Sequence, residues 1–112
     1  MPVSYFILYR GISADGQRFR EHYRKVHVPI LLRFPGARSV FTHVPTGWSD
    51  TAAVNAGGFE LIAQIVFDTP EALAEALRSS ARAAARDDME TNFSAFDGTV
   101  WHQATQTERF TA

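Results

Sequence analysis

The chain of 112 residues contains no cysteine. Disulfide bonds, thiolate catalysis, cysteine-ligated zinc and iron–sulfur clusters are therefore excluded. No apolar run approaches the ~20 residues of a membrane-spanning helix, and a net charge of −1 creates no broad field for nucleic acid or an anionic membrane. Residues 1–4 lack the basic and apolar regions of an export signal. We expect a cytoplasmic protein with no nucleic-acid partner and no membrane partner.

Common cofactor motifs are also missing from the sequence. It has no phosphate-binding loop, no dinucleotide fingerprint and no nucleophile elbow. Hydrophobic residues at 46% and charged residues at 21% are ordinary for a globular chain. Residues 1–112 predict a single domain that is too short to hold a separate cofactor domain. A functional site must then be built from one core or from a dimer.

Four segments have the composition of β-strands, at residues 3–10, 37–44, 59–68 and 99–107. In the third, every second residue from Phe59 onwards is apolar, whereas the alternate residues form a mixed face. The loop between the second and third strands, residues 45–58, is unusually long and therefore a candidate functional segment.

Helical signals lie between these strands. Ser13 or Asp15 can cap a first helix that ends near residues 34–36. Residues 69–71 begin a second helix, which a serine pair at residues 79–80 interrupts before a third. The order βαββαβ predicts an α+β fold with a four-stranded antiparallel sheet and helices on one face.

The other face of such a sheet has no cover within the chain. We expect it to carry Tyr5, Tyr9, Glu60, Ile62, Gln64 and Val66. This set is too apolar for water and too polar for a sealed core. Pairing two sheets face to face would cover it and leave a partly polar cavity, so a homodimer is expected.

A histidine on the first helix is the leading candidate for chemistry. Phe19, Tyr23 and His27 recur at intervals of four and share a face. Pro29 is expected to push Val28 out of helical geometry, which would leave His27 at a local helix C-terminus. There the helix dipole favours the imidazolium and burial favours the neutral ring. His27 is either a proton-transfer group in a pocket wall or a histidine at the edge of the core.

The remaining histidines do not predict a metal site. His22 lies five residues before His27, about 140° around a regular helix, so we expect it to face solvent. His43 and His102 lie on separate predicted strands.

Two groups of residues together resemble the EthD family of dimeric α+β barrels. The first comprises Phe19, His22, Tyr23, His27, Val28 and Pro29, followed by Phe34, Pro35 and Gly36. The second is the run 58–73, continued by Asp88 and Phe93. The resemblance implies a ferredoxin-like subunit, a homodimer joined through its sheets, and a small-molecule pocket between sheet and helix. Members are linked to the breakdown or tailoring of small organic compounds, and related barrels include cofactor-free isomerases, decarboxylases and monooxygenases.

The same resemblance implies site residues. His27 matches the pocket histidine of related enzymes, and Glu60 matches an acidic position on the third strand. Val40 stands where relatives often have a tyrosine, and Gln64 where many have a carboxylate, so a tyrosine of the first strand is expected to supply a phenol. The residues expected to contact the substrate are Tyr5, Tyr9, Tyr23, Val40, Ile62, Gln64, Trp48 and Trp101.

Several of these residues have a second interpretation. Glu60 is either a general base or the anchor of a dimer ion pair. Trp48 and Trp101 form a lid and a pocket wall, or are ordinary packing residues. The row Arg78, Arg82 and Arg86 clamps an anion or forms a solvated stripe paired with nearby glutamates.

The leading interpretation is a cofactor-independent enzyme for a small, largely apolar oxygenated molecule. Isomerisation or decarboxylation would use His27 as proton shuttle, with Glu60 or a first-strand tyrosine as second polar group and with neither cofactor nor metal. The alternatives are a non-catalytic binding or accessory protein and a haem-binding or monooxygenase-type relative.

Overall fold

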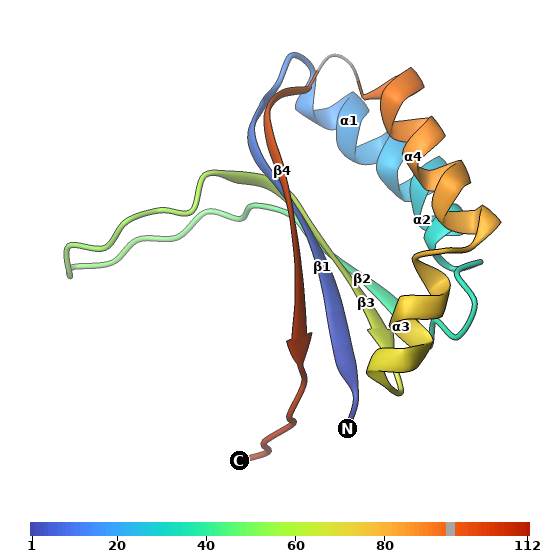
Figure 1. The fold of residues 1–112 in the computed structure, drawn as a ribbon. Coiled ribbons are helices and arrows are strands. Elements are labelled where there is room, and N and C mark those ends of the chain that lie inside the picture. Colours follow the sequence, from blue (N-terminus) through green and yellow to red (C-terminus); the bar gives the residue numbers. More distant parts are fainter. Residues whose placement is uncertain (94–95) are drawn as a thin grey trace.

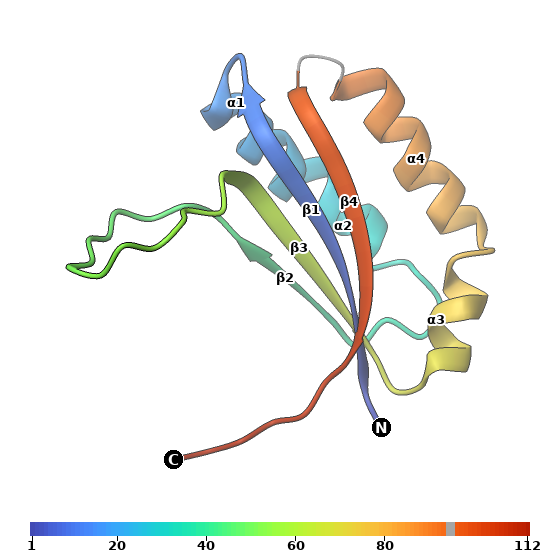
Figure 2. The same ribbon diagram turned by 60° about the vertical axis from the view of Figure 1, so that its left-hand side comes forward.

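The computed structural model describes residues 1–93 and 96–112. Its four strands are β1 (Val3–Ser13), β2 (Ser39–His43), β3 (Phe59–Phe67) and β4 (Phe96–Gln106). They form one antiparallel sheet in the order β2-β3-β1-β4. All helices lie on one face of it (Figures 1 and 2). The α+β fold predicted from the sequence is confirmed, and the described helices leave the opposite sheet face uncovered.

The sheet register decides which side chains meet the helices. β1 pairs Tyr5 with Ile65 and Tyr9 with Leu61, so both tyrosines share the buried apolar face of β3. The expectation that they lie on the mixed face with Glu60 and Gln64 is wrong. Alternation in β1 alone could not choose the face, because its even-numbered residues are also largely apolar.

The first helical region is continuous but irregular. It runs through α1 (Gly16–His22), the π-helical turn η1 (Tyr23–His27) and α2 (Val28–Leu31). Val28 keeps helical angles, φ −57° and ψ −45°, and its N–H donates five residues back to the Tyr23 carbonyl. The predicted break at Pro29 is therefore wrong. The wider turn accommodates Pro29 because it places the proline in the first turn of α2, where its missing N–H costs little.

Two further helices follow β3, and each begins at a side-chain cap. In α3 (Pro70–Ala76) the Thr69 side chain accepts a hydrogen bond from the N–H of Ala72. In α4 (Ser80–Asn92) the Ser79 hydroxyl accepts from Arg82 N–H. The predicted interruption at residues 79–80 is confirmed. β1 and β4 are longer than predicted, because they pair with each other as far as Ser13 and Phe96.

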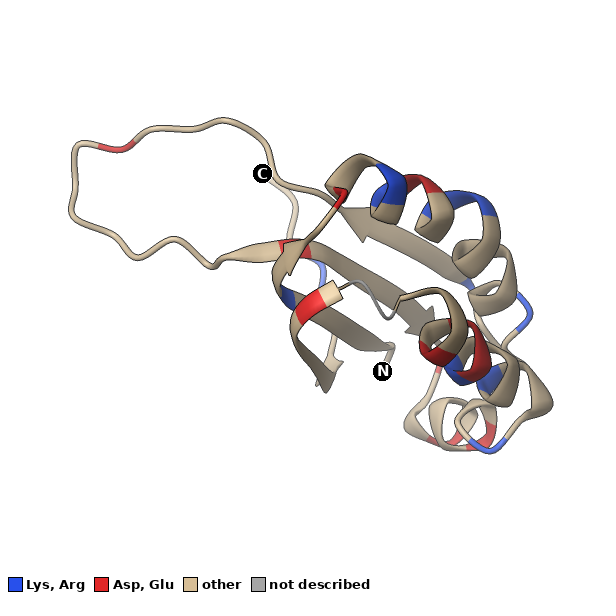
Figure 3. Ribbon diagram, turned by 90° about the horizontal axis from the view of Figure 1, so that it is seen from above, with Lys and Arg blue, Asp and Glu red and all other residues tan. Residues whose placement is uncertain are grey.

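Residues 44–58 form a loop that projects away from the sheet (Figures 1, 2 and 3). It has no regular secondary structure, and Trp48 within it is 64% exposed. Charges of both signs lie on the helices, whereas Asp50 is the one acidic position on the loop (Figure 3).

The paired ends of β1 and β4 approach closely at two glycines. Gly11 has φ +138°, and a Cβ atom there would lie 2.4 Å from the carbonyl oxygen of Asp97. We expect Gly11→Ala to lower the free energy of unfolding by about 1–3 kcal/mol, measured by urea denaturation. Gly47→Ala is the control, since a Cβ at Gly47 would meet nothing within 4 Å. Equal effects of the two substitutions would contradict the close approach.

Candidate functional site

A cavity of about 470 Å³ lies between the sheet and the helices. Side chains from β1, β4, α2 and α4 meet there. Its apolar lining consists of Ile7, Leu31, Phe34, Ala85, Met89 and Val100. Its polar and charged lining consists of Tyr5, Tyr9, His27, Arg82, Arg86, Glu90 and His102. The cavity is on the helix-covered side of the sheet, where the family resemblance implied a pocket, and not between two paired sheets, where the sheet-face argument placed one.

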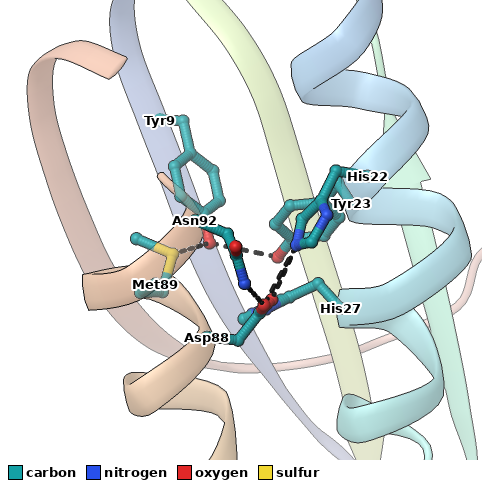
Figure 4. Close-up of polar contacts among 7 residues, drawn as sticks. All are labelled: Tyr9, His22, Tyr23, His27, Asp88, Met89 and Asn92. Carbon is teal, nitrogen blue, oxygen red and sulfur yellow. Dashed lines mark hydrogen bonds and ion pairs between the residues drawn. The ribbon is translucent and has the colours of Figure 1, made fainter. Parts of the chain in front are cut away.

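Behind one wall of the cavity, the buried carboxylate of Asp88 on α4 gathers three polar side chains (Figure 4). His27 Nδ1 lies 2.7 Å from Asp88 Oδ2, and His22 Nε2 lies 3.0 Å from Oδ1. The Asn92 amide donates to Oδ1 at 2.6 Å. Helices α1 to α2 and helix α4 are thus joined through one acidic residue.

The π-helical turn explains how two histidines reach the same carboxylate. Residues five apart diverge on a regular α-helix, but a π turn inserts one additional residue and returns them to one side. His22 directly precedes this turn and His27 is its last residue, and both face Asp88. The expectation that His22 faces solvent is therefore wrong; its side chain is 25% exposed and hydrogen-bonded.

The hydrogen bonds set the protonation of the pair. Burial would raise the pKa of Asp88, but hydrogen bonds from His27, Asn92 and His22 together hold this pKa below its usual value. An ionised carboxylate only accepts, so His27 must donate from Nδ1. Burial lowers the pKa of His27, against the opposing influence of Asp88. Neutral His27 therefore keeps a lone pair on Nε2, which is the form of a general base.

Two buried phenols lie beside His27. The Tyr9 hydroxyl is 3.2 Å from that of Tyr23 and 3.3 Å from Sδ of Met89. The Tyr23 ring packs against the His27 ring, with centroids 4.6 Å apart. Burial raises the pKa of both phenols far above neutrality. They remain protonated and hold the imidazole within an aromatic cluster.

A second polar pair lies on the sheet side of the cavity. The Tyr5 hydroxyl is 2.6 Å from Nδ1 of His102. Burial raises the pKa of Tyr5 and lowers that of His102, and the neighbouring Arg82 and Arg86 lower both. At neutral pH both groups are therefore uncharged and share one hydrogen bond.

Three of the predicted site residues line the cavity: Tyr5, Tyr9 and His27. Tyr23 contacts two of them. Glu60 lies elsewhere, because β1 pairs Tyr9 with Leu61 but Arg10 with Phe59, leaving Glu60 as a β-bulge. Its carboxylate pairs with Arg20 at 2.5 Å within the same chain.

The other predicted contact residues are outside the cavity lining within the described part of the chain. Val40 packs against the core from β2. Ile62 and Gln64 lie on the helix-free face, where Gln64 donates to Ser4 Oγ. Trp48 is in the projecting loop, and Trp101, 58% exposed, pairs with Leu8 on the helix-free face. The loop therefore cannot act as a lid on this cavity as it stands.

Sequence reasoning missed Asp88 and His102 as site residues and left Arg82 and Arg86 as either an anion clamp or a solvated stripe. Asp88 had a signal: it stands seven residues after Ala81 and three after Ala85, on the apolar stripe of its helix. A carboxylate on this buried stripe requires a hydrogen-bonding or ion-pair partner. The place of His102 depends on the β1–β4 register, which the sequence leaves open.

Metal-binding clusters and membrane-spanning helices are both absent from the described residues. No group of three or more histidine, cysteine or acidic side chains there is arranged to hold a metal ion. Nor is any described helix long and apolar enough to cross a membrane.

Comparisons with known proteins agree with this architecture. The model of the EthD domain matches residues 13–97. An EthD family protein from Bacillus halodurans is 25% identical, with 96% of this chain and 100% of that chain covered and a TM-score of 0.73. An EthD-like protein from Ralstonia eutropha is 16% identical over 96% and 95% of the two chains, with a TM-score of 0.69.

A more distant structural neighbour is SnoaB from Streptomyces nogalater, described as a cofactor-independent oxygenase. It is 12% identical over 97% of this chain and 95% of its own, with a TM-score of 0.58. No protein of curated function matches the sequence significantly. The fold and its helix-side cavity define a ferredoxin-like α+β domain. Within that class, the chain belongs to the EthD family.

The burial of His27 makes stability depend on pH. The pKa of His27 in the folded protein is below its value of about 6.5 in the unfolded chain. As the pH falls through about 6.5, the unfolded chain therefore binds more protons than the folded protein does, and unfolding is favoured. The melting temperature should therefore fall between about pH 7.5 and pH 5, and the lowered pKa of Asp88 adds a loss of the same sign below about pH 4.

Circular dichroism melts of the native protein and His27→Gln measure this effect. The melting temperature of the variant should change less between pH 7.5 and pH 5 than that of the native protein. The matched substitution His43→Gln, at an exposed position on β2, should leave the dependence in place. A melting temperature that rises as the native protein is acidified would contradict the assignment.

Proposed function

We propose that this EthD family protein is an enzyme that transforms a small, largely apolar oxygenated compound by cofactor-independent proton transfer. The observation that carries the proposal is the position of His27. Its ring lines the cavity while its Nδ1 lies 2.7 Å from the buried carboxylate of Asp88. A base fixed by an anionic partner and placed against an apolar cavity is suited to remove a proton from a carbon next to a carbonyl group.

In this mechanism Nε2 of His27 takes the proton and Asp88 stabilises the resulting imidazolium. Return of the proton to another atom of the substrate completes an isomerisation. In a decarboxylation, Nε2 would instead take the proton of the substrate's carboxylic acid, the C–C bond would break to release CO₂, and the proton would then be delivered to the carbanion that remains. Tyr5 is the second polar group, because its hydroxyl can rotate from His102 to a substrate oxygen. Glu60 is not assigned a role in proton transfer, since its carboxylate is engaged by Arg20 outside the cavity.

A related second candidate is a cofactor-independent oxygenase. The description of SnoaB favours it, and a substrate carbanion formed by the same base could react with molecular oxygen. A third candidate is non-catalytic binding of an apolar metabolite, for which the cavity alone would suffice. Both candidate functions use the same cavity as the leading proposal. They differ from it in the step that follows ligand binding, which is reaction with oxygen for the oxygenase and no reaction for the binding protein.

Exchange of the α-protons of phenylacetone in D₂O, followed by proton NMR, tests the proposed base without knowledge of the natural substrate. The native protein should accelerate exchange over buffer. His27→Ala should reduce the protein-dependent rate by about two to four orders of magnitude, and His27→Gln should do no better, because a carboxamide cannot shuttle a proton.

His43→Gln is the matched control, since His43 lies on β2 at an exposed position and should not affect exchange. Rates are compared at equal concentrations of folded protein. Near-normal exchange in His27→Gln would refute the catalytic assignment. Binding of phenylacetone without acceleration would leave the binding protein as the better interpretation. Oxygen consumption in the same assay would favour the oxygenase.

We also propose that the protein is a homodimer joined through the helix-free sheet face. The apolar residues on that face are Phe6, Leu8, Phe41, Ile62, Val66 and Trp101. Phe41 and Trp101 are exposed. A contiguous apolar sheet face without cover in the chain is typical of a subunit interface. A structural neighbour from Bacteroides fragilis with a ferredoxin-like fold is itself described as dimeric.

Sedimentation velocity at micromolar concentration should give a particle of twice the 12.5 kDa chain mass. Trp101→Glu should shift the equilibrium toward monomer by placing a charge in the interface. Phe110→Glu is the control, at an exposed position in the C-terminal segment beyond β4. A native protein that sediments as a stable monomer would refute the dimer.

A further inference from the structure

The lining of the cavity is apolar at one end and polar and charged at the other. Its floor is formed by apolar side chains of β1, α2 and α4, whereas two arginines of α4 stand beside Tyr5 and His102. Arg86 and His102 are exposed and Tyr5 is buried, so this cluster forms the mouth of the cavity. A ligand that enters must pass two guanidinium groups before its body reaches the apolar floor.

The two arginines are not neutralised by an ion pair. Among the ion pairs within residues 1–93 and 96–112, none involves Arg82 or Arg86. Glu90 is the acidic residue in the cavity lining, and it is farther from both than ion-pair distance. With two guanidinium groups and one carboxylate, the lining retains an excess of positive charge. Arginine groups that line a partly apolar cavity without a carboxylate partner are suited to hold an anionic ligand oxygen.

We propose that the ligand of this cavity is a carboxylate with a compact apolar body. The carboxylate lies at the mouth and accepts hydrogen bonds from Arg82 and Arg86, while the body fills the apolar floor near Leu31, Phe34 and Met89. This inference rests on the proposed function for the location of the site and adds the substrate class. The Tyr5–His102 pair is neutral and supplies a polar wall beside the two arginines.

This arrangement also favours one of the two reactions proposed above, isomerisation, over the other, decarboxylation. Guanidinium groups stabilise the carboxylate that they bind, so that carboxylate is held in place and not lost. A proton shift elsewhere in the molecule, catalysed by His27, is then favoured over decarboxylation at the mouth.

Calorimetric titration with 2-naphthoate and 2-naphthamide tests the proposal. The probes share a body and differ in charge. The native protein should bind the carboxylate at least about tenfold more tightly than the amide. Arg82→Met and Arg86→Met should each reduce that preference, and the double variant should abolish it while amide binding is retained. Methionine keeps the apolar stem of arginine and removes only the charged head.

Arg78→Met is the matched control, because Arg78 belongs to the same row of arginines but does not line the cavity. It should keep the native preference. Equal affinity of the two probes for the native protein, or a preference that survives in the double variant, would overturn the proposal.

The experiment also separates this proposal from the proposed function. His27→Gln should keep the preference for 2-naphthoate even though it loses exchange activity. A failed exchange assay with intact carboxylate preference would remove only the catalytic role. Exchange of neutral phenylacetone without any carboxylate preference would remove only the substrate class.

Discussion

The arrangement of the site depends on one carboxylate, that of Asp88. It accepts hydrogen bonds from two histidines of the first helical region and from Asn92 on its own helix. A buried acid with fewer donors would be protonated or would destabilise the fold. Three donors keep it ionised, and its charge in turn fixes the proton of His27 on the ring nitrogen that faces away from the cavity. One interaction therefore joins two helices and selects the tautomer of the candidate base.

The π turn makes this interaction possible. It brings His22 and His27 to one side of the helix, and it accommodates Pro29, which a regular helix would tolerate poorly at that point. Irregular turns of this type occur frequently at functional sites. Here the irregularity has a defined geometric result, because a strictly α-helical path would turn one of the two imidazoles away from Asp88.

Features that depend on local pattern could be predicted from the sequence. The strands, the caps at Thr69 and Ser79, and the interruption at residues 79–80 follow from side-chain alternation and capping chemistry. The face of Tyr5 and Tyr9 could not be predicted, because β1 is apolar on both sides and only its register with β3 decides between them. Glu60 was misplaced because a bulge redirects it toward Arg20. His27 was found from the sequence, whereas Asp88 depends on contact between distant helices.

The cavity lies on the helix-covered side of the sheet. In a dimer joined through the helix-free faces, the two cavities lie on the outer sides, separated by both sheets. In such a dimer each cavity opens to solvent through its own mouth, and any coupling between the two ligands has to pass through both sheets.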